Sequence, residues 1–445
     1  MLKTLRRYYW ITQSFLERHS KIIVRTTSIF LSLILIFFLF ARYLPTPKHT
    51  FRIGRVGKYS FDTFPQDIQS KISRGLVSIT EGGKVQGELA KNWEITDDGK
   101  TYIFTLDENI RWHDGSVLTP GDINYNFKDV ETTIKDNTIT YKLKEPFSPF
   151  LTVVTRPILK KGKIGTGEYL LTKSQISNGV LQSLTLESPN NRLIYKFYPT
   201  ETSSLTAYKL GEIDTIERLS FISDELKQDT TSSVIGDFNS DNQQGVLFFN
   251  NNDVILTSKP ARQALAYAIK DKTFGKERSI SPIDTSSWAY NDLVKTYDYD
   301  PTKAKTLFAQ DIKDPTTQKL ELKTMLKYLD VAESIAESWR NVLGIQVDVK
   351  VVSNITSDYQ IILTDFTPPL DPDQYTIWHS TQGTNFTHFS NLKIDKLLED
   401  GRRTSDQKLR KEIYEDFQRF LLEDCPAVFL FKSNTYTLSR KTLFN

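Results

Sequence analysis

Hydrophobic and polar positions alternate most regularly between residues 88 and 115. In "TYIFTLD" (101–107), Tyr102, Phe104 and Leu106 alternate with their neighbours, and "LAKNWEIT" (89–96) precedes this run across the turn sequence "DDGK". Alternation with period two on both sides of an Asp/Gly turn predicts two paired strands. A second turn is expected at Asp114-Gly115, and "TPGD" (119–122) resembles a helix start with Thr119 as its cap.

Later in the chain the spacing of apolar residues changes from every second position, as in a strand, to the period of a helix, and then back to every second position. "KLELKTML" (319–326) reads as a strand, "VAESIAESWRNVLG" (331–344) as a helix that ends at Gly344, and "IQVDVKVV" (345–352) and "YQIILT" (359–364) as strands. This order predicts an α/β domain with a largely parallel sheet, joined by crossover connections. Two further helices are expected, from Pro260 and after the Asp300 cap.

The last long helix is expected from about Ser405 to Asp424. Thr404 and Gln407 have the spacing of a capping box, and an apolar stripe would face the core. That stripe consists of Leu409, Ile413, Phe417, Phe420 and Leu421.

The loop "DFTPPLDPDQY" (365–375) follows the predicted strand "YQIILT" directly. Ligands of open parallel sheets bind just beyond the carboxyl ends of the strands. Asp365, Asp371 and Asp373 would place carboxylate acceptors there. The position predicts a ligand-binding loop.

The first fifty residues have a different character from the rest. "TTSIFLSLILIFFLFA" (26–41) carries no charge, and Ile22 to Val24 extend it beyond Arg25. This length is workable for a membrane span, and the basic residues before it favour a cytoplasmic N-terminus. We expect a cytoplasmic basic tail at 1–21 and an uncleaved transmembrane anchor at 22–43, with the main domain on the outer face of the cytoplasmic membrane. A cleaved signal peptide is the alternative, but "FARYLPTPK" offers no small-x-small cleavage pattern.

Charge and cysteine content narrow the function classes. Six of the 57 basic residues and one of the 54 acidic residues lie in positions 1–25, so the remainder carries 51 basic and 53 acidic residues. No basic tract suggests nucleic acid. The single cysteine, Cys425, has no partner for an internal disulfide and is expected to be a buried small hydrophobe.

Several residues could carry chemistry, but each has a simpler explanation. His113-Asp114 is next to a glycine turn, where aspartate bonds its own backbone, so we interpret it as a corner rather than an acid–base pair. His379 and His388 are weak as a metal pair. Asp371 and Asp373 could be the carboxylates of a hydrolase, although Asp-Pro-Asp is also an ordinary turn. We expect no catalytic activity, metal or cofactor.

The accumulated segments resemble the family 5 extracellular solute-binding proteins, the peptide/nickel class that serves ABC importers. Eight stretches in family order carry the resemblance: "LAKNWEITDDGKTYIFTLDENIRWHDG", "IGTGEYLL", "LFFNNND" with "ARQALAYAIKDK", "WAYNDLVKTYDYDPTKAKTLF", "DYQIIL" with "LDPDQY", and "NFTHFSNLKIDKLLEDGRR". They cover essentially everything after residue 51.

The resemblance implies a two-lobed α/β fold of the type II periplasmic-binding-protein kind. Residues 51–250 and 426–445 would form lobe I and residues 251–425 lobe II. The short passage through "KDVETTIKDNTITYKL" (128–143) implies a reduced accessory subdomain. The candidate ligand-binding residues are Tyr59, Asp365, Thr367, Asp371, Asp373, Tyr375 and Asn385.

The implied function is capture of a peptide or peptide-like solute and its delivery to an ABC permease and ATPase by a monomeric receptor. Peptide-binding relatives hold the free amine with an aspartate at the position occupied here by Pro368. Either Asp365 or Asp371 substitutes for it, or the ligand lacks that amine. A ligand sensor or chaperone-like module without transport is the alternative, and a hydrolase the weaker one.

Overall fold

The computed structural model describes residues 2–41, 48–80, 82–228, 231–237, 242–352 and 358–441. They form two compact units, one from the N-terminus to His49 with Pro189–Asn191, the other comprising the rest. The first consists mainly of α1 (Leu2–Ala41), a single helix of 40 residues. Within α1, Arg6–Phe37 is long and apolar enough to cross a membrane. The expected end of the anchor, at Tyr43, lies outside the described residues.

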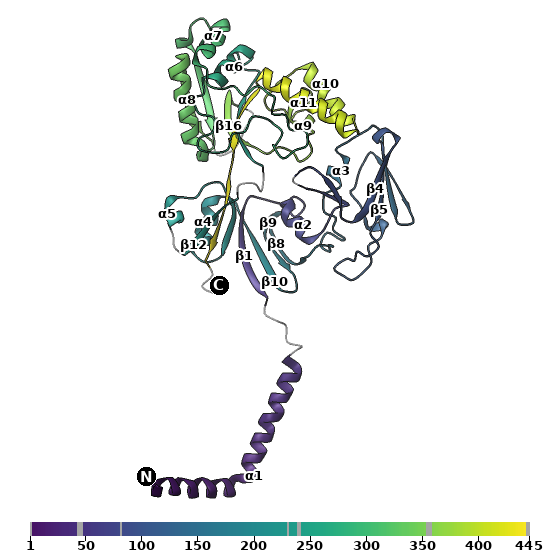
Figure 1. Cartoon of the computed structure of the whole chain (residues 1–445), viewed down its shortest axis with the longest axis vertical. Helices are drawn as coiled ribbons and strands as arrows, with labels where there is room; N and C mark the ends of the chain where they lie inside the picture. Colours follow the sequence, from purple (N-terminus) through teal and green to yellow (C-terminus); the bar gives the residue numbers. More distant parts are fainter. Residues whose placement is uncertain are drawn as a thin grey trace. The chain divides into compact units, whose positions relative to one another are not determined.

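The second unit contains two large sheets, a four-stranded sheet and a two-stranded ribbon (Figure 1). The first large sheet has the order β12-β18-β11-β1-β10-β9-β8. Its strands are β1 (His49–Val56), β8 (Leu170–Ser177), β9 (Val180–Glu187), β10 (Asn191–Tyr198), β11 (Thr215–Leu219), β12 (Ser232–Asp237) and β18 (Thr435–Arg440). The helices α2 (Gln66–Ile72), α4 (Glu201–Lys209) and α5 (Asp224–Gln228) contribute to its two cores.

The smaller sheet, in the order β4-β5-β7-β6, contains the predicted hairpin. Its strands are β4 (Ala90–Thr96), β5 (Thr101–Leu106), β6 (Val130–Lys135) and β7 (Thr138–Leu143). Thr96 pairs with Thr101 across the turn, which confirms the expected pairing. The inward residues Tyr102, Phe104 and Leu106 are at most 1% exposed. The ribbon β2 (Val77–Ile79) and β3 (Val85–Gly87) and the short helix α3 (Phe150–Val153) lie in the same part of the chain.

The expected helix after Thr119 is wrong. Only a 3₁₀ turn, Pro120–Asp122, forms there, although Thr119 and Asp122 do make the capping box. Tyr125 fixes the following segment in a non-helical path, because its hydroxyl accepts a bond from the Leu76 amide (3.1 Å) and donates one to the Val154 carbonyl (2.7 Å). Asn126 also has a φ of 54°, outside the right-handed helical range.

The second large sheet has the order β15-β14-β16-β13-β17. Its strands are β13 (Gln244–Phe249), β14 (Lys319–Thr324), β15 (Gln346–Val351), β16 (Ile361–Phe366) and β17 (Ala427–Lys432). The predicted strand–helix–strand unit is confirmed: β14 pairs in parallel with both β15 and β16. The sheet is mixed rather than largely parallel, because β13 is antiparallel to β16 and β17.

Helices cover both faces of this sheet, as Figure 1 shows. Alternate residues of β13 enter opposite cores: Leu247 and Phe249 pack with α6 and α8, whereas Val246 and Phe248 pack with α10 and α11. The helices are α6 (Lys259–Ala268), α7 (Pro301–Asp311), α8 (Leu329–Leu343), α9 (Tyr375–Trp378), α10 (Leu392–Arg403) and α11 (Gln407–Asp424). The short 3₁₀ turns at Pro315–Thr317 and Leu326–Tyr328 complete this lobe.

Sheet pairing moves the expected lobe boundaries. The chain was expected to pass from lobe I to lobe II near Asn250 and to return near Cys425, which would place β13 and β17 in lobe I. Both strands instead pair within the second large sheet. The chain therefore crosses before Gln244 and again between Lys432 and Thr435, where β18 joins the first sheet. Cys425 is the residue that ends α11, and the chain does not pass between the lobes there. Residues 442–445 of the expected lobe I lie outside the described part.

The start and inward face of α11 also differ from expectation. Asp406, not Thr404, is the cap, and its carboxylate accepts from the Leu409 amide (2.9 Å). Leu409 is 54% exposed, whereas Arg410 is 6% exposed and points inward. The helix turns this way because Arg410 bonds the carboxylate of Asp371 and the carbonyl of Gly401.

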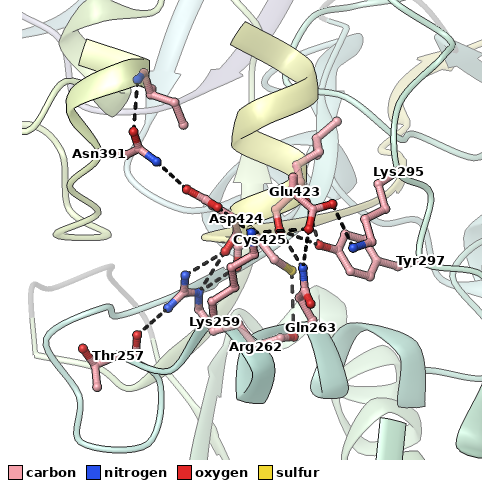
Figure 2. A network of polar contacts seen from close by, with 12 residues as sticks. Thr257, Lys259, Arg262, Gln263, Lys295, Tyr297, Asn391, Glu423, Asp424 and Cys425 are labelled. Carbon is pink, nitrogen blue, oxygen red and sulfur yellow. Dashed lines mark hydrogen bonds and ion pairs between the residues drawn. The ribbon is translucent and has the colours of Figure 1, made fainter. Parts of the chain in front are cut away.

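A polar network secures the C-terminal end of α11 (Figure 2). The buried guanidinium of Arg262 donates to the carbonyls of Leu256 (2.7 Å), Thr257 (3.0 Å), Asp424 (2.7 Å) and Cys425 (3.1 Å). These bonds satisfy carbonyls that have no partner inside a helix. Cys425 is fully buried, as expected, and burial raises the pKa of its thiol to about 11.

Candidate functional site

The predicted ligand loop begins with a carboxylate that already has partners. Asp365, the penultimate residue of strand β16, forms an ion pair with Lys327 and accepts a bond from the Tyr328 hydroxyl (2.6 Å). Both partners follow β14, the parallel neighbour of β16, so the carboxyl ends of the two strands meet here as expected. The Tyr328 hydroxyl is also 2.7 Å from that of Ser433.

Two arginines hold the two aspartates of the Asp-Pro-Asp turn. Arg410 of α11 contacts both oxygens of Asp371, at 2.9 and 2.5 Å, and Arg402 of α10 donates to Asp373 at 2.7 and 3.1 Å. The side chains of Asp371 and Arg410 are 15% and 7% exposed. A two-point ion pair at such burial fixes the loop to α11.

The ion pair also determines the charge state of Arg410. Burial opposes the charged guanidinium, but the hydrogen bonds and negative charge of Asp371 outweigh it, so the pKa of Arg410 is raised. Arg410 therefore remains a cation, and its charge is matched within the protein. The pair offers a ligand little net charge.

The other four candidates have local roles. Asn385 is buried and donates to the Phe389 carbonyl (2.8 Å), which stabilises a turn. Tyr375 packs against His379 (4.1 Å between ring centroids) and Arg402, and Thr367 is exposed. Tyr59 donates to the Val56 carbonyl (3.0 Å) and packs on Phe197 in the first lobe. The structure does not gather the seven residues into one site.

A cavity of about 530 Å³ lies beside Asp371. One wall comes from the region of β2, β3, β4 and α3, and the other from the second lobe. The lining residues are Ile79, Gly82, Gly83, Lys84, Val85, Trp93, Ile95, Ser148, Leu151, Thr152, Trp288, Leu370, Asp371, Ser405, Gln407 and Arg410. The walls touch at Ser148, whose amide donates to the Arg402 carbonyl (2.8 Å).

A second hollow of about 350 Å³ continues from the first. The two share Ile79 and Leu370, and the second is lined also by Arg74, Glu88 and the start of β2. Together they form a cleft between the two walls, in the size range of small-ligand sites. The first cavity is lined by residues from both walls, so a ligand in it would contact both.

The cavity surface is mainly aromatic and aliphatic. Trp93 and Trp288 are half-buried, and Ile95 and Leu370 are 41% and 51% exposed. The guanidinium of Arg410 lies 5.6 Å from the Trp288 ring. Half-buried tryptophans beside exposed aliphatic side chains suit stacking and apolar contact with a ligand.

Of the seven candidates, only Asp371 lines this cavity. Trp93, Trp288 and Leu370 were missed because they lie far apart in the sequence and only the fold brings them together. The sequence could have indicated Leu370 as a cavity residue, because an apolar residue between Pro369 and Asp371 in a polar loop belongs to no predicted strand or helix that would bury it.

The histidine candidates serve the fold. The Asp114 carboxylate bonds the Ser116 amide (2.9 Å) in its own turn, while His113 lies 2.9 Å from the Gly167 carbonyl and accepts from Gly165. This geometry confirms a corner rather than an acid–base pair. His379 contacts Thr381 and Glu399. Among the described residues, no group of three or more His, Cys, Asp or Glu is arranged to hold a metal.

Comparisons with known proteins agree with this architecture. The chain is 24% identical over 422 residues to the probable D,D-dipeptide-binding periplasmic protein DdpA of Escherichia coli, covering 80% of this chain and 81% of that one. Among solved structures, NikZ from Campylobacter jejuni in complex with Ni(L-His) matches with a TM-score of 0.74 at 23% identity, covering 89% and 95% of the two chains.

AppA from Bacillus subtilis in complex with a nonapeptide matches with a TM-score of 0.67 at 20% identity, covering 89% and 95%. Such structural matches show the two-lobed fold. The family model of the bacterial extracellular solute-binding proteins, family 5, matches residues 84–132 and 130–388. The chain belongs to the bacterial extracellular solute-binding proteins, family 5.

Proposed function

We propose that this protein is a membrane-tethered receptor that captures a peptide or peptide-like solute and presents it to an ABC permease and its ATPase. The observation that carries the proposal is the 530 Å³ cavity, whose walls come from both lobes. A ligand there bridges the lobes and favours the closed form, which is how binding proteins of this architecture report occupancy. No bond is made or broken.

The ligand is recognised without an anchored free amine. The position that holds the amine in peptide-binding relatives is Pro368, and both possible substitutes, Asp365 and Asp371, are already paired with Lys327 and Arg410. A ligand amine would have to displace a buried cation from its partner, at a cost of several kcal/mol (roughly 3–5). Backbone hydrogen bonds and contacts with Trp93, Trp288 and Leu370 fit the cavity better.

Two observations support the tether. The second half of α1 carries the apolar run of the candidate span Arg6–Phe37, and the hydroxyls of Thr26 and Thr27 are satisfied by the carbonyls of Ile22 and Ile23. Sequencing the N-terminus of the mature protein and fractionating the cells tests the tether. A soluble species that begins after Tyr43 would contradict it.

Binding is tested by titrating the full chain in nanodiscs with matched peptides carrying a free or an N-acetylated amino terminus. We expect equal affinities within a fewfold, and a loss of roughly tenfold or more in Trp288→Ala. The matched control is Trp10→Ala in α1, which should bind like wild type. A strong preference for the free amine that disappears in Asp371→Asn would contradict the amine-independent mode.

A further inference from the structure

The first half of α1 has two chemically distinct faces. A helix turns by about 100° per residue, which places Tyr8 and Phe15 on one side and Lys21 on the other, with Arg7 towards the edge of that other side. Ile11 and Arg18, seven positions apart, are neighbours where the two sides meet. Leu16 and Tyr9 extend the first side and Arg6 and Ser14 the second, while Trp10 lies within the polar side. This division is that of an amphipathic helix with a basic polar face.

The apolar face is strongly exposed. Tyr8, Ile11, Phe15 and Leu16 are 69%, 55%, 58% and 53% exposed. Large aromatic and aliphatic side chains gathered along one helix face call for a covering surface. Tyrosine and tryptophan also suit the boundary between lipid headgroups and acyl chains, where one end of the ring is apolar and the other is wet.

The polar face determines which surface covers it. Arg6, Arg7, Arg18 and Lys21 carry positive charge, and the single acidic residue, Glu17, is bonded by Gln13 (3.3 Å). A cytoplasmic membrane leaflet rich in anionic lipids attracts basic residues held close to it. Charge and apolarity therefore select the same occupant, an anionic lipid surface.

The amphipathic part of α1 is close to the membrane surface because it is continuous with the proposed membrane-spanning part. The amphipathic part runs directly into the apolar part of the same helix, and α1 bends between the two in Figure 1. A bend lets one part cross the bilayer while the other lies along its surface.

We propose that residues 6–21 lie on the cytoplasmic leaflet as an interfacial helix, with Tyr8 and Phe15 inserted between the lipids and the basic side chains on anionic headgroups. This inference rests on the proposed membrane tether. It adds a second attachment, which fixes how deep the anchor sits and resists its being pulled through the membrane.

The test attaches an environment-sensitive fluorophore at Phe15→Cys or Ser14→Cys in the full chain, reconstituted in nanodiscs. Cys425 is fully buried with a pKa of about 11, so the parent chain should take up no label. In discs of phosphatidylglycerol and phosphatidylcholine, we expect blue-shifted emission at position 15 and water-like emission at position 14.

Charge is tested by neutralising Arg6, Arg7, Arg18 and Lys21 to glutamine, with arginine-to-lysine changes at the first three as the matched control. Each neutralised charge should lower the ratio of docked to free helix about fivefold, and the lysine variant should remain docked. Water-like emission at both positions, or docking that needs added permease, would overturn the proposal. So would equal docking in purely zwitterionic discs. Retention of the protein in the discs reports the anchor separately.

Discussion

At each end of α11 a buried arginine ties the helix to other parts of its lobe. Arg410 at the first end is 6% exposed and holds Asp371, and Arg262 at the last end, contributed by α6, is 4% exposed and holds the final carbonyls. By burial and hydrogen bonding alone the two are alike. Arg410, however, lines the cavity, whereas Arg262 lies among α6, the Leu256–Thr257 carbonyls and the helix end.

The difference shows what marks a site in this protein. Paired buried charges occur at both ends, so pairing by itself indicates stabilisation of the lobe. The cavity with tryptophans on opposite walls lies beside the first end. Changes at the last end should therefore affect stability alone, and changes at the first end both stability and binding.

The largest effect is expected for Arg262→Met. It leaves four carbonyls without their donor. The bonds of one side chain are not additive, and the largest losses from single substitutions in buried hydrogen-bond networks are about 4–5 kcal/mol, so the free energy of unfolding should fall by roughly 3–5 kcal/mol. Chemical denaturation measures this loss. Ligand affinity of the folded fraction should stay within a fewfold.

The matched control is Arg419→Met on the exposed side of the same helix. Arg419 contacts only Asp416 (2.8 Å) among the ion pairs of the described residues, and surface pairs contribute about 0–1 kcal/mol. A loss at Arg262 no larger than at Arg419 would show that the carbonyl contacts do not stabilise the helix end.

Arg410→Met should come next. Removing the cation leaves Asp371 partly buried and unpaired, and we expect a loss of roughly 3 kcal/mol in the free energy of unfolding, moderated because the carboxylate borders the cavity. Ligand affinity should change as well. In a double-mutant cycle, Asp371→Asn added to Arg410→Met should restore part of the stability. Strictly additive losses would mean that the two side chains are not coupled.

A buried lysine near the last end adds a pH-dependent effect. Burial, and next the charge of Arg278, lower the pKa of Lys272 from 10.5 to about 8. Between pH 8 and 10.5 the unfolded chain keeps a proton that the folded chain has released, so this residue makes stability rise with pH in that window, by roughly 2 kcal/mol.

Lys272→Met should remove that rise, measured by denaturation at pH 7.5, 9 and 10.5. The exposed neighbour Lys270→Met is the control and should keep the wild-type slope. An unchanged slope in Lys272→Met would mean that the ammonium is solvated in the folded protein.

Local patterns predicted the secondary structure well where one face of an element is buried. The hairpin of β4 and β5, the β14–α8–β15 unit and the left-handed Gly344 cap followed from periodicity and turn chemistry. The lobe boundaries did not follow from such local patterns. They depend on hydrogen bonding between strands almost 200 residues apart, which places β13 and β17 in one sheet.

The candidate site was less predictable for a related physical reason. The sequence of a charged loop at the carboxyl end of a strand is the same whether its aspartates bind a ligand or pair with an arginine of the protein. The sequence located the loop, and Asp371 does reach the cavity, but its partner Arg410 comes from a helix 39 positions away. The apolar pattern predicts Leu409 as the inward residue, which would leave Arg410 on the outer side of the helix.

The smallest effect is expected at the cap of α11, where sequence and structure disagree by two residues. Asp406→Ala removes the bond to the Leu409 amide and should lower the free energy of unfolding by about 1 kcal/mol. Asp406→Asn should keep most of it, since asparagine also caps. Thr404→Ala, at the cap predicted from sequence, removes only a bond to the Asp400 carbonyl and should cost less. Urea midpoints at constant slope measure all three.

Because Ser405 and Gln407 line the cavity, a frayed helix start would also loosen its wall, so Asp406→Ala should weaken ligand binding slightly while Asp406→Asn does not. If Thr404→Ala is the more destabilising change, the helix begins where the capping box predicted, and the inward position of Arg410 needs another cause.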